Sequence, residues 1–249
     1  MLTILQSGFH YSATEGYGYG SSYSFAIILM VVVTLDGAIV QMRWSAGTRR
    51  YSEKPSPRGS TGREIAEKML HDHGIYNVAV THVKGHLTDH FNPTTMTVNL
   101  SDDVYNSATI TALAVAAHEC GHAVQHATGY GPIRMRSQLV PIVNFSSKVA
   151  GWVILAGVAM MSFTNSAALC WVGIALVAIS ALFALVTLPV EYNASERAVA
   201  WLESSGTLGD ESLDGAHEAL RWAARTYLVA ALSAIVTILY YIVLIKSRR

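Results

Sequence analysis

Charged residues are scarce in this sequence. Only 14% of its 249 residues are Asp, Glu, Lys or Arg, whereas soluble domains carry about a quarter. The deficit falls in long apolar stretches, which is the pattern of helices that cross a membrane. The 17 basic and 17 acidic residues cancel and form no long run of one sign. The composition therefore argues against a freely soluble domain and predicts no nucleic-acid partner.

Cysteine and N-terminal basic residues are also rare. Cys120 lies between two histidines and Cys170 lies in an apolar stretch, and these are the only two cysteines. We predict that both are reduced packing residues and that they do not form a disulfide. Residues 1–22 contain neither Lys nor Arg, so they lack the basic start of a signal peptide. We predict a flexible tail there.

Four apolar stretches are long enough to cross a bilayer as helices. Pro189 follows the third of them and is predicted to end or kink it. The water-facing parts are then residues 43–138 and 189–226. The sequence thus predicts a mainly α, multi-pass protein of a cell membrane with a small α+β domain. The predicted spans are residues 23–42, 139–163, 167–188 and 227–245.

The motif H-E-x-x-H occupies residues 118–122. Side chains four residues apart lie on one helix face with Cβ atoms about 5–6 Å apart, so His118 and His122 can bind one metal ion. The flanking residues are small and apolar, which predicts a buried helix. Buried histidines and a buried glutamate are costly unless they are paired or bind a metal. We therefore predict a Zn²⁺ site with Glu119 as its catalytic residue.

A catalytic zinc site needs a third protein ligand. Two predicted spans follow the motif, so residues 190–225 return to the same side of the membrane. Glu191 is the best candidate, because it directly follows the third span. Ser195 lies one turn later and is predicted to hydrogen-bond a ligand. Gly121 is unfavourable inside a helix, and a close approach by the Glu191 helix would explain it.

Three short strands are predicted before the motif helix, at residues 76–83, 87–91 and 96–101. Asn92-Pro93 marks a turn between the last two, and we expect a short antiparallel sheet. The third strand alternates in polarity and directly precedes the motif. We predict that it is an exposed edge, which can pair with an extended substrate. The residues of this predicted substrate edge are Thr97, Val98 and Asn99.

The motif also predicts a reaction. A zinc-activated water would lose a proton to Glu119, which acts as general base, and would attack a peptide carbonyl. Such sites usually provide a second donor to the oxyanion. Tyr105, His90 and Arg197 are three open candidates for that donor.

Four segments together resemble a known family: residues 85–93, 118–122, 188–195 and 215–231. In this order they resemble the bacterial neutral zinc metallopeptidases of the YugP type, which are multi-pass membrane proteins. The resemblance covers about residues 63–245. It implies that His118 and His122 bind zinc and that Glu119 is catalytic, and it supports Glu191 as third ligand. More distantly, the chain resembles the membrane gluzincins that include the CAAX prenyl protease, which carry Asp where this chain has Ser195.

We therefore expect a membrane-bound, zinc-dependent endopeptidase of the gluzincin type with a zincin-like domain over residues 43–138. Its expected partners are a peptide or membrane-protein substrate, the lipid bilayer and other membrane proteins. The alternative is a non-catalytic membrane scaffold, or a partner-binding protein, with a structural zinc site. A transporter fits less well, because the spans show no internal repeat.

The basic residues predict the orientation of this site in a bacterial cytoplasmic membrane. Short membrane-flanking segments rich in Lys and Arg stay in the cytosol. Three basic residues, Lys246, Arg248 and Arg249, flank the spans on the side opposite the motif. The motif side carries many more, so we expect the zinc site to face the cytosol. Those residues are Arg43, Arg49, Arg50, Lys54, Arg58, Arg63, Arg134, Arg136, Lys148, Arg221 and Arg225.

Ser60 provides a test of this orientation. In a variant with Cys120 and Cys170 replaced, a cysteine introduced by Ser60→Cys should resist a membrane-impermeant thiol reagent in intact cells. The same cysteine should react after the cells are permeabilised, because residue 60 is predicted to lie on the cytosolic side. Labelling in intact cells would reverse the orientation.

Overall fold

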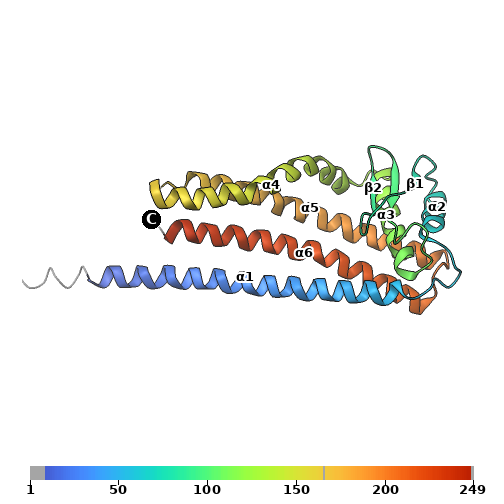
Figure 1. The fold of residues 1–249 in the computed structure, drawn as a ribbon, viewed down its shortest axis with the longest axis horizontal. Coiled ribbons are helices and arrows are strands. Elements are labelled where there is room, and N and C mark those ends of the chain that lie inside the picture. The colour runs from blue at the N-terminus through green and yellow to red at the C-terminus, as the bar shows by residue number, and fades with distance from the viewer. Residues whose placement is uncertain (1–8, 165, 248–249) are drawn as a thin grey trace, which may run out of the picture. The chain divides into compact units, whose positions relative to one another are not determined.

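The computed structural model describes residues 9–164 and 166–247. The first helix, α1 (Phe9–Ser52), begins inside the predicted flexible tail, so residues 9–22 are helical, and residues 1–8 lie outside the described residues. Helices dominate the described chain (Figure 1). The other elements are α2 (Gly62–Asp72), β1 (Ala79–His82), β2 (His90–Asn92), β3 (Thr97–Leu100), α3 (Ile110–Ala127), α4 (Gly131–Thr164), α5 (Ala168–Ser204) and α6 (Asp210–Ser247).

Among the described residues, four helices are long and apolar enough to cross a membrane: α1 from Ser24, α4, α5 and α6. Each extends beyond the span predicted from the sequence. Of the two effects predicted for Pro189, an end of the helix differs from the structure, because α5 continues through Pro189 to Ser204. A proline inside a helix removes one hydrogen bond, and the long apolar helix tolerates this loss.

The chain forms two compact units. The first comprises Met1–Gly37, Val140–Phe183 and Val229–Arg249, as far as the structure describes them. Here α4 and α5 approach closely at two glycines: a Cβ added to Gly157 would lie 2.7 Å from Cys170 N, and one on Gly173 would lie 2.4 Å from Ile154 Cγ1. Small residues let helix backbones meet in this way within membranes. Large apolar side chains of this unit, such as Phe25 on α1 and Phe163 on α4, remain exposed.

The second unit comprises Ala38–Leu139 and Ala184–Leu228 and contains the sheet, α2 and α3. The strand order is β1-β3-β2. β2 pairs antiparallel with β3, with Phe91 opposite Val98, but β1 pairs parallel with β3. The sheet is therefore mixed, and the prediction of an antiparallel sheet was wrong for β1. The chain between β1 and β3 includes β2, and this longer connection lets the first strand run parallel to the third.

The strand order also corrects the predicted substrate edge. β3 has β1 on one side and β2 on the other, so the backbone of Thr97, Val98 and Asn99 is already paired within the sheet. Alternation along a sequence shows that a strand has two different faces, but it does not distinguish a central strand from an edge strand. Of the two edge strands, β1 and β2, the one that contacts α3 is β2.

The core of this second unit surrounds α3. Thr109 caps the helix, and its side chain accepts a hydrogen bond from Ala112 N at 3.3 Å. Ala116, Ala117 and Cys120 are fully buried, and the Cys120 thiol donates to Ala66 O of α2 at 3.5 Å. Burial raises the pKa of this thiol, which makes Cys120 an unreactive packing residue. The small side chains of α3 thus let its neighbours pack close to the motif.

Gly121 marks the closest of these approaches. A Cβ added there would lie 2.6 Å from the carbonyl oxygen of Ala194 on α5 and 3.1 Å from its carbonyl carbon. No side chain fits at such distances, so only glycine allows α3 and α5 to meet here. The sequence prediction that a second helix approaches Gly121 agrees with this contact. Ala194 lies between Glu191 and Ser195, so the contact sets where these two side chains meet α3.

The variant Gly121→Ala tests this contact. Overpacking of a close backbone contact typically costs about 1–3 kcal/mol, so we expect a lower melting temperature in detergent. Gly47→Ala is the matched control, because its added Cβ meets no atom of the described residues within 4 Å and alanine favours the helix by about 1 kcal/mol. Equal melting temperatures for the two variants would contradict the proposed constraint.

Candidate metal centre

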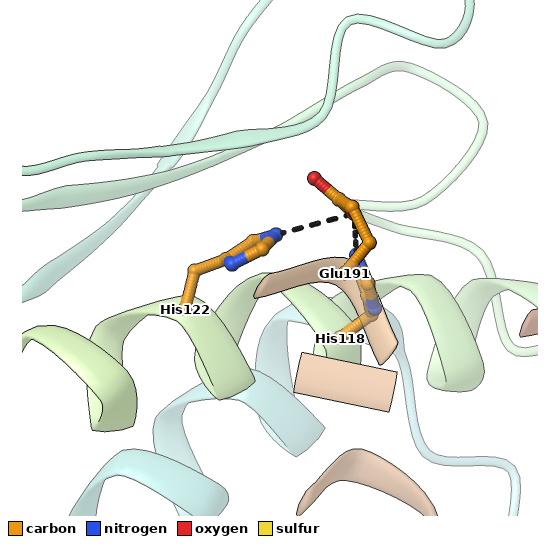
Figure 2. A group of neighbouring side chains, drawn as sticks. All are labelled: His118, His122 and Glu191. Atoms are coloured by element: carbon orange, nitrogen blue, oxygen red, sulfur yellow. Dashed lines mark hydrogen bonds and ion pairs between the residues drawn. The ribbon is translucent and has the colours of Figure 1, made fainter. Parts of the chain in front are cut away.

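Two histidines of α3 and one glutamate of α5 point at one another (Figure 2). His118 Nε2 lies 3.1 Å from Glu191 Oε2, and His122 Nε2 lies 3.6 Å from the same oxygen. The two imidazole rings stand edge to face, with centroids 4.8 Å apart. All three side chains are largely buried. The structure therefore brings together the three residues that the sequence predicted as ligands.

These donor atoms fit a zinc ion. Zinc binds histidine nitrogen at about 2.0–2.1 Å and carboxylate oxygen at about 2.0–2.2 Å, so neighbouring donors of a tetrahedral site lie about 3.4 Å apart. The two nitrogen–oxygen distances, 3.1 and 3.6 Å, fall on either side of this value. One ligand atom from each residue lies within 4.8 Å of the others. Two imidazoles and one carboxylate also match the donor set of catalytic zinc sites.

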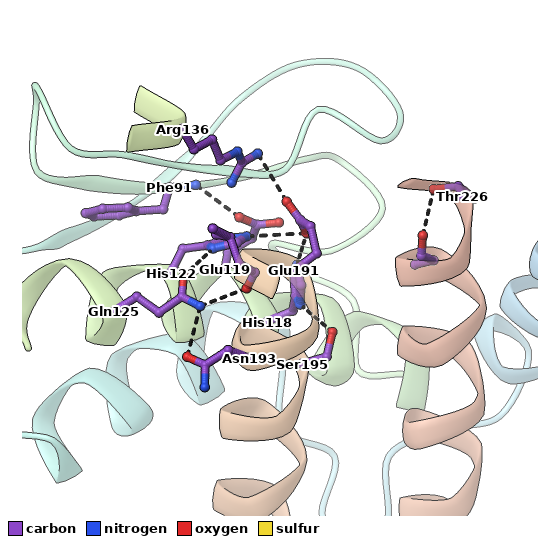
Figure 3. A network of polar contacts seen from close by, with 12 residues as sticks. Phe91, His118, Glu119, His122, Gln125, Arg136, Glu191, Asn193, Ser195 and Thr226 are labelled. Atoms are coloured by element: carbon purple, nitrogen blue, oxygen red, sulfur yellow. Dashed lines mark hydrogen bonds and ion pairs between the residues drawn. The ribbon is translucent and has the colours of Figure 1, made fainter. Parts of the chain in front are cut away.

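A buried glutamine fixes the orientation of His122 (Figure 3). The Gln125 amide nitrogen donates to Val190 O at 2.7 Å and to Asn193 Oδ1 at 3.1 Å. Its oxygen therefore faces His122 Nδ1 at 3.0 Å, and Nδ1 must carry the proton. This tautomer leaves the lone pair of Nε2 on the side of Glu191, as a metal ligand requires.

His118 has an equivalent outer contact. Its Nδ1 lies 3.2 Å from Ser195 Oγ, which can accept the Nδ1 proton and leave the Nε2 lone pair free. Burial by itself lowers the pKa of His118, but the hydrogen bond to Glu191 and the charge of Glu119 outweigh it and raise this pKa. The same carboxylates that favour a protonated imidazole create a potential that favours a cation.

Glu191 is held from its other side by α4. Arg136 Nη2 lies 3.2 Å from Glu191 Oε1, as an ion pair without good hydrogen-bond geometry. The Glu191 side chain is only 5% exposed, so an unpaired charge there would be costly. Oε2 faces the histidines and Oε1 faces the arginine, which fixes the plane of the carboxylate.

Glu119 faces the same space but lies outside the cluster of donor atoms. Its Oε2 accepts a hydrogen bond from Phe91 N of β2 at 3.0 Å. Glu119 and the three clustered residues line a small cavity of about 130 Å³, together with Asp89, His90, Phe91, Arg136 and Tyr227. The edge strand β2 therefore positions the carboxylate beside the candidate metal ligands.

The three candidate oxyanion donors lie in different places. Tyr105 packs against the His82 ring and Arg197 donates to Asn193 Oδ1, and neither lines this cavity. His90 does line it, but its Nδ1 lies 2.7 Å from Thr88 O and its Nε2 lies 3.2 Å from Asn99 Nδ2. Both of its nitrogens already have partners.

Sequence reasoning missed Gln125, Arg136 and Tyr227 as members of the site. Gln125 follows His122 by three residues on the same helix face, and this spacing was the one available signal for it. Arg136 was considered only as one of many basic residues near the membrane. Tyr227 stood at the predicted start of the fourth span, where an aromatic residue usually marks the membrane interface.

Comparisons with known proteins show the family of this chain. The family described as "Putative neutral zinc metallopeptidase" matches residues 25–246, and the chain belongs to this family. The chain is also 38% identical over 209 residues to "Putative membrane protease YugP" of Bacillus subtilis (strain 168), which covers 84% of this chain and 91% of that protein. No solved structure matches the chain. The family implies zinc as the metal, and the cluster of two histidines and one glutamate could hold it.

Gln125→Ala tests the outer contacts. Loss of a hydrogen-bond partner of a metal-binding histidine typically lowers metal affinity by about 10–100-fold, and we expect a loss in this range. A competition titration against a chelator of known affinity would measure it in the purified protein. Thr128→Ala is the control, because among the described residues that hydroxyl donates only to the carbonyls of Val124 and Gln125 at the end of α3. An unchanged zinc affinity in Gln125→Ala would contradict the role of the amide.

Proposed function

We propose that this chain is a membrane-bound zinc endopeptidase in which His118, His122 and Glu191 hold the metal. The observation that carries the proposal is the convergence of two Nε2 atoms on Glu191 Oε2, 3.1 and 3.6 Å away, with Glu119 on the same cavity wall. Membership of a zinc metallopeptidase family supports it further. The site faces the cytosol in this proposal, for the reasons of charge given above.

Glu119 is the proposed general base. Zinc, when bound, lowers the pKa of a water to about 7 and polarises a peptide carbonyl. The hydrogen bond from Phe91 N holds Glu119 Oε2 at 3.0 Å, and Oε1 accepts no hydrogen bond within residues 9–164 and 166–247. Oε1 can therefore take a proton from the attacking water and pass it to the leaving nitrogen.

Other residues of the cavity would position the substrate. The arginine Arg136 and the phenol of Tyr227 both line the cavity and carry hydrogen-bond donors that a developing negative charge requires. β2 is the edge strand next to Glu119, so an extended peptide that pairs with the sheet would lie along β2. The pairing with substrate that the sequence predicted for Thr97, Val98 and Asn99 is therefore assigned to β2 instead.

Two substitutions test the proposal when zinc content and peptide hydrolysis are measured in parallel. Glu119→Gln keeps the three ligands and should retain zinc, while hydrolysis should fall by at least about 100-fold because the base is lost. Glu191→Ala removes one ligand and should lose most of the bound zinc. Glu196→Ala is the matched control, because Glu196 is an exposed acid on the same helix.

The outcomes separate the proposal from its alternative. A scaffold with structural zinc would retain the metal and hydrolyse no peptide, even as the unmodified protein. Full hydrolysis by Glu119→Gln would refute the assignment of the base. Equal zinc content in Glu191→Ala and Glu196→Ala would show that another residue is the third ligand.

A further inference from the structure

Two larger cavities adjoin the small metal-site cavity. The second cavity has a volume of about 340 Å³ and shares Asp89, His118, Glu119, Glu191 and Tyr227 with the first. The third has a volume of about 560 Å³. It shares Trp44, Leu87, Asp89, Val115, Leu220 and Ala223 with the second. The second cavity therefore shares a wall with the metal-site cavity, and the third shares a wall with the second.

The chemistry of the walls changes from the first cavity to the third. The metal-site cavity is lined mainly by charged and imidazole side chains. The two larger cavities add apolar side chains from three helices: Trp44 from α1, Val115 from α3, and Leu220 and Ala223 from α6. All of these residues belong to the second unit of the chain. A peptide bond beside Glu119 would therefore have an apolar chamber next to it.

We propose that the second and third cavities receive a bulky apolar side chain, such as Leu, Phe or Met, next to the scissile bond. This inference rests on the proposed function and adds the substrate class to it. The second cavity falls within the range of about 300–1,000 Å³ that is typical of ligand pockets. Its apolar wall favours burial of an apolar group from water. The enzyme therefore prefers peptides with a large apolar residue at the cleavage site.

Five acids line these walls, and two of them, Glu119 and Glu191, belong to the proposed metal site. The other three do not favour a basic side chain instead. Asp89 Oδ1 accepts from Ser101 N at 2.7 Å and Oδ2 accepts from Ser101 Oγ at 2.9 Å. In the third cavity, Asp102 pairs with His82 and with Gly85 N, and Asp103 pairs with His86. A basic side chain would have to be desolvated without displacing these partners, which is costly.

Ala223 provides a way to test the chamber. Ala223→Leu would fill the wall that the second and third cavities share. Ala230→Leu is the control, because Ala230 is an exposed alanine about two turns further along α6. The background for both is zinc-loaded Glu119→Gln, which should bind peptides without cleaving them. The probes are blocked, fluorescently labelled Gly/Ser decapeptides with one central Phe, Leu, Ala or Lys.

We expect the Phe and Leu peptides to bind at least about tenfold more tightly than the Ala and Lys peptides, in line with the selectivity of apolar pockets. Ala223→Leu should reduce this ratio by about tenfold, and Ala230→Leu should leave it unchanged. Equal binding of all four peptides would overturn the inference. So would a ratio that is the same in Ala223→Leu and Ala230→Leu.

A second variant keeps the inference testable if Ala223→Leu does not fold. Val115→Ala enlarges the space beside the same shared wall and should shift the preference from a Leu peptide towards a Trp peptide. An unchanged preference would count against the chamber.

Hydrolysis by the unmodified protein is measured separately. Peptide cleavage without apolar preference would overturn the chamber alone. Apolar binding without any cleavage would overturn the proposed function alone.

Discussion

The backbone contact between Gly121 and Ala194 is the constraint on which the rest of the site depends. An added Cβ at Gly121 would lie 2.6 Å from Ala194 O, so the two helices meet at a distance that no larger residue permits. The contact lies within the HExxH motif on α3 and between Glu191 and Ser195 on α5. Both a candidate ligand and the outer partner of His118 are positioned by it. A larger separation would remove both from reach.

The apolar chamber strengthens the interactions between the charged residues of the polar site. Interactions between charges strengthen where water is excluded, and the apolar walls of the adjoining cavities lie next to Glu119 and Glu191. The pairs within the site compensate for this burial, because each carboxylate has a fixed partner: Phe91 N donates a hydrogen bond to Glu119, and Arg136 forms an ion pair with Glu191. The sheet edge and α4 therefore stabilise charges that α3 and α5 bring together.

Sequence reasoning was strongest where spacing alone carries the chemistry. The motif placed His118 and His122 on one helix face, and the number of spans brought Glu191 back to them. Sequence reasoning failed for features that depend on which other elements pack against a segment. Alternation did not reveal that β3 is central, and Pro189 did not stop α5. Gln125 and Arg136 look like ordinary polar residues until the fold supplies Val190, Asn193 and Glu191 as their partners.

The bridge formed by Gln125 has a thermodynamic consequence. Its amide joins His122 of α3 to the main chain at Val190, the residue before Glu191. The candidate ligands on the two helices are thereby linked, so an ion that binds both of them would also stabilise the packing of those helices. Anything that binds the folded state selectively stabilises it in proportion to the logarithm of its concentration. Zinc bound at these residues would therefore stabilise the fold as well as take part in the chemistry.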